Sequence, residues 1–318
     1  TVRVTDTQGR AVPGVQVSFT VVSGQVSLAP LSVATDPSGN ATTNATAGPT
    51  AGAVVVRANV QGLAIAPTFS LTIVPPAPVF TASNIRNWLS GERTLAPGVL
   101  ARLTGTNLVA NLNGAITSLP TGPWPGVVNG ISIDISGQAA PLYQIANSNN
   151  EQSIIFQVPF EIAAGTARVT VTTPTGTAFA DVTIADVSPG LLEITVGARR
   201  YAVLVKANGT LVSPQNPANR GELLRAYFTG LGRTNPGVLT NTPGSGGQLV
   251  AAVIFTGVNN EGVRTVSAEY AENLIGMYVV TFEVPTNAPT GSDIPFGLGV
   301  RIGGDVIFSN GSVIASVQ

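Results

Sequence analysis

The sequence predicts an all-β protein built from β-sandwich domains, and three observations support this prediction. Valine, threonine, alanine, isoleucine and leucine dominate, and their short apolar stretches often alternate with polar residues, as in half-buried strands. The 36 glycines and 23 prolines end these stretches at turn-like positions. No window keeps an apolar stripe at helical spacing over three or four turns, so an α/β enzyme fold is not expected.

Residues 1–74 form the first predicted domain. Val2 and Val4 alternate with polar neighbours, and a similar alternation runs from Val15 to Val21. Residues 6–9 and 35–40 read as turns, the second with a proline preset for the turn and a glycine able to take positive φ. Two further strands are expected at residues 54–58 and 69–74. About seven short strands in this length predict a sandwich.

A proline-rich linker follows at residues 75–78, and beyond it the chain repeats weakly. Pro75-Pro76-Ala77-Pro78 favours a stiff, extended spacer. The step Phe156-Gln157-Val158-Pro159 recurs 126 residues later as Phe282-Glu283-Val284-Pro285, and Thr104-Gly105 recurs 125 residues later. Two anchors at nearly one offset predict duplicated domains at residues 79–187 and 188–318.

Two stretches carry a resemblance to known families. VTDTQGRAVPGVQVSFTVVSG (residues 4–24) with TDPSGNATT (residues 35–43) resembles the bacterial Ig-like group 1 domain of invasin and intimin type proteins. That resemblance implies a surface stalk repeat, with one strand more before Thr1 than this sequence contains.

The remaining 240 residues or so resemble an uncharacterised C-terminal domain family of acidobacterial secreted proteins, through LAPGVLARLTGTNL (95–108), SIIFQVPFEI (153–162), SPGLLEI (188–194), SPQNPANRGELLRAYFTGLG (213–232) and YVVTFEVP (278–285). Each half also resembles an IPT/TIG type Ig-like domain. The resemblances imply three tandem immunoglobulin-like β-sandwich domains and bring no assigned activity.

Composition argues against several function classes. Only 10% of residues are charged, against roughly 25% in an average domain, and the net charge is −1, so no basic stripe for nucleic acid is present. No apolar run is long enough to predict a transmembrane segment. Histidine is absent, which removes the commonest general base and metal ligand, and no carboxylate pair or calcium loop is recognisable. We therefore expect no enzyme, no cofactor and no metal site.

Several isolated residues have both a functional and a plainer structural explanation. Trp124, in Pro123-Trp124-Pro125-Gly126, is a candidate glycan contact or a side chain folded over a domain junction. Lys206, the single lysine, could form an isopeptide bond with an asparagine. Glu222 is the carboxylate with which a hydrolase would be tested, and Arg220 is expected to order its long loop by hydrogen bonds to carbonyl groups.

The sequence favours an extracellular or cell-surface structural protein, either a stalk or a subunit of a self-assembling filament. Because the chain opens inside a strand pattern, residues Thr1, Val2, Arg3 and Val4 are a candidate assembly edge. A strand from the next copy would complete this edge and give a head-to-tail homopolymer. The alternative is a non-catalytic adhesin or carbohydrate-binding module of a larger secreted protein, with surface polysaccharide or surface proteins as partners.

Overall fold

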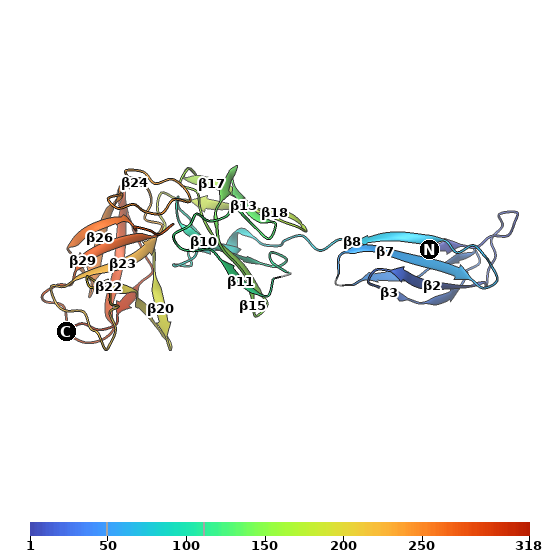
Figure 1. Ribbon diagram of the computed structural model, residues 1–318, viewed down its shortest axis with the longest axis horizontal. Coiled ribbons are helices and arrows are strands. Elements are labelled where there is room, and N and C mark those ends of the chain that lie inside the picture. The colour runs from blue at the N-terminus through green and yellow to red at the C-terminus, as the bar shows by residue number, and fades with distance from the viewer. Residues whose placement is uncertain (49, 111) are drawn as a thin grey trace. The chain divides into compact units, whose positions relative to one another are not determined.

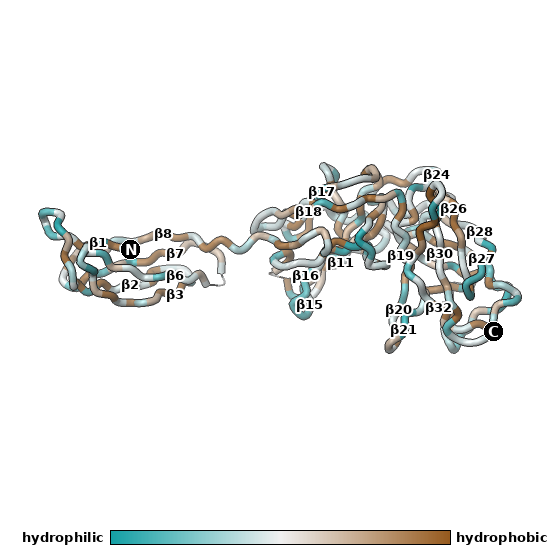
Figure 2. Tube along the Cα trace, turned by 180° about the vertical axis from the view of Figure 1, so that it is seen from behind, coloured by the Kyte–Doolittle hydropathy of each residue, from teal (hydrophilic) through white to brown (hydrophobic). Residues whose placement is uncertain are grey.

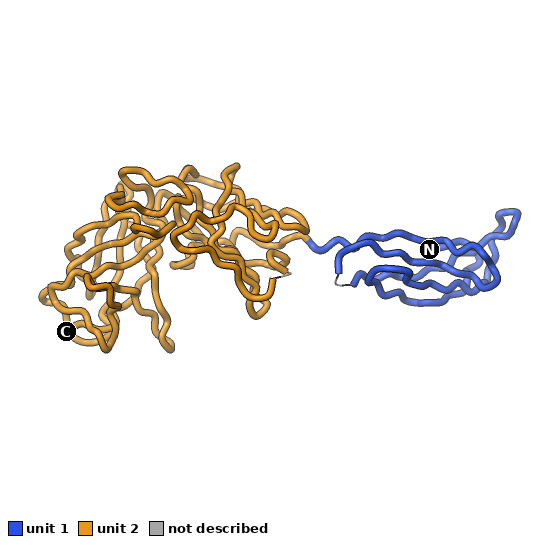
Figure 3. Tube along the Cα trace, viewed as in Figure 1, with its two compact units in different colours: residues 1–76 blue, residues 77–318 orange. Residues whose placement is uncertain are grey.

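The computed structural model describes residues 1–48, 50–110 and 112–318, and this part of the chain is almost entirely strand and turn (Figure 1). The only helical element described is a single 3₁₀ turn, η1 (Ala82–Asn84). The all-β prediction is therefore confirmed. In the described ranges, no helix has the length and apolar character to cross a bilayer. The chain divides into two compact units, Thr1–Pro76 and Ala77–Gln318 (Figure 3).

Unit 1 contains a four-stranded sheet of order β4-β2-β7-β8 and two strand pairs, β1-β5 and β3-β6. Its strands are β1 (Val2–Arg3), β2 (Gln16–Ser23), β3 (Val26–Ala29), β4 (Ser32–Ala34), β5 (Asn40–Ala41), β6 (Asn44–Ala47), β7 (Gly52–Val60) and β8 (Thr68–Ile73). Asp36 is the predicted turn former, because its Oδ1 accepts hydrogen bonds from the backbone N–H groups of Ser38 and Asn40.

The core of unit 1 is small and arises from the alternation predicted for its strands. Burial alternates along β2 and β7, so their buried apolar residues point inward, and hydrophobic and hydrophilic segments both occur along the strands of this unit (Figure 2). Val17 and Phe19 of β2 and Val54 and Val56 of β7 are buried against Leu28 of β3. The core thus lies between β2 and β7 on one side and the short strand pairs on the other.

The boundary between the units falls within the predicted proline-rich linker. Pro75 and Pro76 belong to unit 1 and Ala77 to unit 2. The carbonyl oxygen of Ala77 accepts a hydrogen bond from Asn107 Nδ2 at 3.2 Å, and Val79 exchanges both backbone hydrogen bonds with Thr106. The second half of residues 75–78 is therefore attached to unit 2.

The first half of unit 2 has two sheets, ordered β11-β15-β16-β10-β9 and β12-β13-β17-β18, with β14 paired to β13. The strands are β9 (Ile85–Asn87), β10 (Leu100–Gly105), β11 (Gly114–Thr117), β12 (Val127–Val128), β13 (Ile131–Ile135), β14 (Gln138–Ala140), β15 (Leu142–Ser148), β16 (Glu151–Gln157), β17 (Gly165–Thr173) and β18 (Gly176–Ile184). One apolar cluster fills the space between the two sheets.

The second half of unit 2 repeats this plan around its own cluster. Its sheets are ordered β19-β23-β29-β28-β25-β24, with β22 paired to β23, and β20-β21-β32-β30-β26-β27, with β31 paired to β30. The strands are β19 (Gly190–Leu191), β20 (Glu193–Val196), β21 (Arg199–Ala202), β22 (Leu204–Lys206), β23 (Leu223–Thr229), β24 (Thr234–Asn235), β25 (Leu249–Val250), β26 (Val253–Val258), β27 (Glu261–Val263), β28 (Thr265–Tyr270), β29 (Tyr278–Glu283), β30 (Ile294–Ile302), β31 (Asp305–Phe308) and β32 (Ser312–Ile314).

The repeated sequence step occupies equivalent strands in the two halves. Phe156 lies on β16, which pairs antiparallel with β10, and Phe282 lies on β29, which pairs antiparallel with β23. Both phenylalanines are fully buried. In each half, the strand that leads to Thr-Gly therefore lies beside the strand that leads to Val-Pro.

Candidate functional site

The N-terminal segment proposed as an assembly edge is a strand of its own domain. Val2 pairs with Ala41 and Arg3 with Asn40, while the Val4 N–H donates to the carbonyl of Gly39. The Thr1 hydroxyl lies 2.9 Å from that of Thr42. Across the described residues β5 is the single strand partner of β1, and the ladder is only two residues long. The segment can therefore offer little backbone to an incoming strand.

A longer sheet edge in unit 1 is formed by β8. This strand pairs with β7 on one side, and no second strand partner occurs in the part of the chain that the structure describes. Leu71 lies opposite Val54 and Phe69 opposite Val56, so both project toward the core side of the sheet. Val54 and Val56 are buried, yet Phe69 is 37% and Leu71 43% exposed. The core-side stripe of β8 is thus left partly uncovered.

The sequence of β8 does nothing to protect this edge. Its six residues, TFSLTI, contain no charge and no proline. Natural edge strands usually carry charges, prolines or bulges, because unpaired N–H and C=O groups otherwise recruit another strand. The sequence shows the alternation of apolar residues with threonine and serine in β8. It does not show that Phe69 and Leu71 remain partly exposed.

Trp124 does not lie on an open loop. It is only 4% exposed and packs with Leu100 and Ile275 where the two halves of unit 2 meet. Its Nε1 donates to the carbonyl of Leu119 at 2.6 Å, and its ring centroid lies 5.0 Å from that of Tyr143. The glycan contact proposed for Trp124 is corrected: the ring is packed into the junction, the other reading of its sequence context.

Buried polar groups join the same two halves. Asn241 forms two hydrogen bonds with the backbone of Trp124, at 2.8 and 2.9 Å, and its own N–H donates to Gln157 Oε1 at 2.8 Å. Gln157 is fully buried, and its Nε2 donates to the Tyr270 hydroxyl at 3.4 Å. Burial raises the pKa of Tyr270 to about 12. This network fixes how the two halves dock, because buried polar groups tolerate only arrangements that satisfy them.

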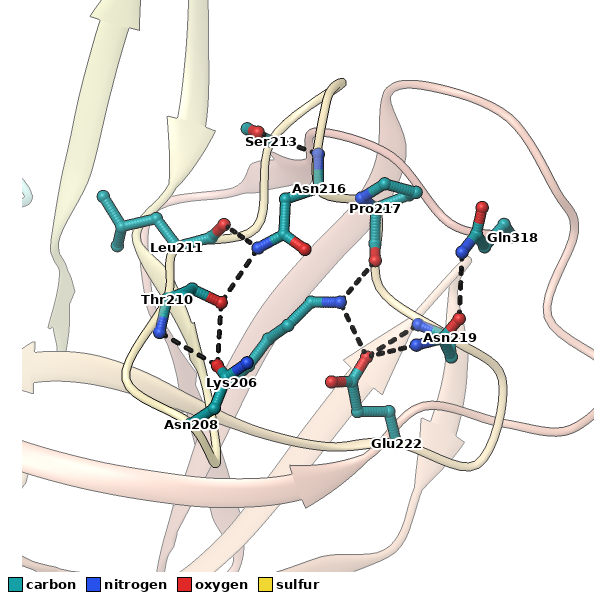
Figure 4. Close-up of polar contacts among 10 residues, drawn as sticks. All are labelled: Lys206, Asn208, Thr210, Leu211, Ser213, Asn216, Pro217, Asn219, Glu222 and Gln318. Atoms are coloured by element: carbon teal, nitrogen blue, oxygen red, sulfur yellow. Dashed lines mark hydrogen bonds and ion pairs between the residues drawn. The ribbon is translucent and has the colours of Figure 1, made fainter.

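Lys206 is buried, and its side chain binds the loop before β23 (Figure 4). Its ammonium donates to the Pro217 carbonyl at 2.6 Å and lies 3.3 Å from Glu222 Oε2. The same carboxylate oxygen accepts from the backbone N–H and from Nδ2 of Asn219, at 2.8 and 3.2 Å. Lys206 and Asn219 therefore both contact the carboxylate of Glu222. Lys206 and Glu222 form an ion pair, and Asn219 adds hydrogen bonds to it. Glu222, the carboxylate chosen from the sequence for a hydrolase test, thus binds Lys206 and Asn219.

Arg220 orders the neighbouring backbone, as the sequence predicted. Its Nε donates to the carbonyl of Ala288 at 2.7 Å. Together with the Lys206 anchor, this bond ties the loop before β23 to the segment between β29 and β30.

Comparisons with known proteins give low similarities to solved structures and a family match over residues 1–73. A search of curated proteins found no match. Among solved structures, an invasin described as a bacterial integrin-binding protein aligns at 13% identity over 98% of this chain and 55% of its own, with a TM-score of 0.27. The D0–D1 domains of intimin align at 20% identity over 57% of this chain and 84% of theirs, with a TM-score of 0.22.

These structural similarities are low, and the chain spans just over half of the invasin structure. The resemblance of residues 79–318 to the acidobacterial family stays a prediction. The sequence of residues 1–73 matches the bacterial Ig-like domain (group 1). The matched residues span nearly the whole of unit 1, and the family similarity therefore applies to this unit.

Proposed function

We propose that this chain is a non-catalytic structural protein of the bacterial cell surface or extracellular space, whose copies join by strand addition at β8. In this proposal residues 1–74, 79–187 and 188–318 are three successive immunoglobulin-like modules. The N-terminal module makes the contact between copies, and the two that follow form the body of a stalk or filament. Partners are other copies of the chain, assembled head to tail.

The observation that carries the proposal is the open edge of β8. Six residues offer a backbone ladder three times as long as the two residues of β1. An added strand would pair its backbone with β8 and cover Phe69 and Leu71. Each side chain is about two-fifths exposed, so covering it is worth about 1 kcal/mol on top of the backbone hydrogen bonds.

Low charge favours a second copy as the source of that strand. Charged residues make up 10% of the chain and the net charge is −1, so copies repel one another weakly. The strand that fits must present apolar residues at every second position, a pattern that recurs along the strands of this chain. A non-catalytic role agrees with a sequence that contains no histidine.

The test compares assembly of the full chain with that of a variant whose β8 edge is charged. Phe69→Lys combined with Leu71→Lys places two ammonium groups on the exposed stripe, which disfavours an incoming strand. Ile65→Lys is the matched control, since it charges an apolar residue that is 82% exposed but lies outside the strand. Each protein is examined by size-exclusion chromatography and negative-stain electron microscopy over a range of concentrations.

We expect linear assemblies from the wild type and the control and monomers from the double variant. Circular dichroism establishes that the double variant keeps its β structure. A wild-type chain that stays monomeric at high concentration would contradict the proposal. So would a double variant that assembles as the wild type does.

A further inference from the structure

A groove of about 730 Å³ lies on the outer face of the sheet that contains β26, β27, β30 and β32. The inward residues of these strands, such as Val258 and Leu298, belong to the core. The outward residues line the groove and are not used by the contacts described so far. Its volume is within the range of ligand pockets, roughly 300–1,000 Å³.

The floor of the groove is made of glycine. Gly262, Gly257 and Gly297 lie opposite one another on β27, β26 and β30 and form one row across the sheet. None of the three has a positive φ. A Cβ atom would meet nothing within 4 Å at Gly262 or Gly297, and only ordinary contacts at Gly257. The fold does not require glycine at these positions. The absence of three side chains from this row is therefore consistent with a surface kept open for a ligand.

Two phenylalanine side chains border the adjacent row. Phe255 of β26 and Phe308 of β31 both pair with Gly299 of β30, from opposite sides. With neighbouring strands about 4.8 Å apart, the two Cα atoms are roughly 10 Å from each other. Phe308 is 74% and Phe255 39% exposed, and the guanidinium of Arg301 lies 4.6 Å from the Phe255 ring centroid. The Phe308 ring lies over Gly299, because a Cβ atom on this glycine would come within 3.3 Å of Phe308 Cε1. The open part of the groove is therefore the neighbouring row of Gly262, Gly257 and Gly297, with the two rings along one side.

The rim of the groove is polar with little net charge. Arg200 and Glu261 contribute one charge of each sign, and Asn260 and Ser309 add neutral hydrogen-bonding groups. Gly257 and Gly297 lie on strands inside the sheet, whose backbone groups are engaged in ladders on both sides. Gly262 lies on the edge strand β27, and a peptide added there as a further strand would lie beside the floor and not on it. A wholly apolar ligand would leave the rim without partners. A pyranose ring fits both parts, since its C–H faces can stack on aromatic rings and its hydroxyl groups reach the rim.

We propose that this groove on the second half of unit 2 binds a neutral polysaccharide, one sugar ring lying on the row of Gly262, Gly257 and Gly297, beside Phe255 and Phe308. The site is separate from the β8 edge and goes beyond the assembly proposed above. It places glycan recognition on the sheet face, away from the junction that contains Trp124.

The test is native affinity electrophoresis in gels containing galactomannan, hydroxyethylcellulose or xylan, with alginate as an anionic comparison. Gly297→Val fills the floor at a position where the fold has space, and Phe308→Ala removes one wall. Phe179→Ala is the matched control, because Phe179 is 58% exposed and Arg168 lies 4.2 Å over its ring, but on the other half of unit 2.

We expect at least one neutral polysaccharide to retard the wild type and the control, and the two groove variants to lose about tenfold or more in affinity. The measurement is repeated in the β8 double variant, so that failure of assembly and failure of binding are separated. The proposal is overturned if no neutral polysaccharide retards the wild type, if only alginate does, or if Gly297→Val is retarded as strongly as the wild type.

Discussion

Replacing Glu222 by glutamine removes the charge beside Lys206 and keeps the size of the side chain. The side chains of Lys206 and Glu222 are 8% and 21% exposed. A glutamine oxygen can still accept from Asn219, but the ammonium is left with the carbonyl of Pro217. Breaking a buried ion pair costs about 3–5 kcal/mol, and because Glu222 reaches some solvent we expect about 2–3 kcal/mol.

The reverse change should cost less. Lys206→Met leaves a carboxylate that keeps two hydrogen bonds from Asn219 and some water, so we expect about 1–2 kcal/mol. In the double variant neither charge is buried alone, and the total cost should fall below the sum of the two single costs by about 1–2 kcal/mol.

Urea unfolding followed by tryptophan fluorescence measures these costs. Trp88 and Trp124 are the two tryptophans of the chain and both lie in unit 2, so the signal reports on the unit that holds the ion pair. Asp181→Asn, which breaks an exposed ion pair with Arg168, is the control and should leave the midpoint unchanged. A Glu222→Gln variant as stable as the wild type would refute the reasoning, as would a larger loss from Lys206→Met.

Three further outcomes are expected. Burial raises the pKa of Tyr270 to about 12 and the pKa of Tyr278 well above its usual value, whereas unfolded tyrosine titrates near 10. The folded state therefore keeps these protons to a higher pH than the unfolded state does. The free energy of unfolding should keep its full value below about pH 10 and fall as the pH rises toward 12, by about 3 kcal/mol for Tyr270 alone. Urea midpoints at increasing pH measure this fall, and a constant midpoint would contradict it. Asn241→Ala removes two side-chain hydrogen bonds to the Trp124 backbone and should cost about 2 kcal/mol in urea unfolding, whereas no loss would show that the junction does not depend on them. Gly297→Val should stabilise the fold by about 0.5–1 kcal/mol, seen as a higher unfolding temperature, because valine suits a strand and meets no neighbour; a lower temperature would mean that the floor is not free.

Local pattern was enough to predict the strands but not their surroundings. Alternation placed Phe19 and Val54 inside unit 1, and the repeated step placed Phe156 and Phe282 on equivalent strands, because both signals reside in short stretches of sequence. The exposure of Leu71 depends instead on how far the strands that pack against its face of the sheet extend. The sequence of β8 itself contains no information about this.

The same limit applies to the two candidate glycan sites. Trp124 is buried by Ile275, a residue 151 positions away whose approach depends on how the two halves dock. Gly257 and Gly297 form a floor only because the register of β26 and β30 places them opposite each other. Contacts between residues so far apart in the chain are decided by tertiary packing. The sequence shows which residues are present but not which of them will be in contact.

The burial of Lys206 makes the chain a reporter of its own local opening. Every other basic side chain is an arginine, so a lysine-specific protease has one cleavage site in 318 residues. That residue is 6% exposed, its ammonium is held by two oxygen atoms and it pairs with Leu224 at the end of β22, so cleavage must wait until the end of β22 and the loop after it open. When reclosing is faster than cleavage, the digestion rate follows the equilibrium population of the open form. A single peptide bond therefore converts a protease time course into the free energy of opening of this loop, with no label added to the chain.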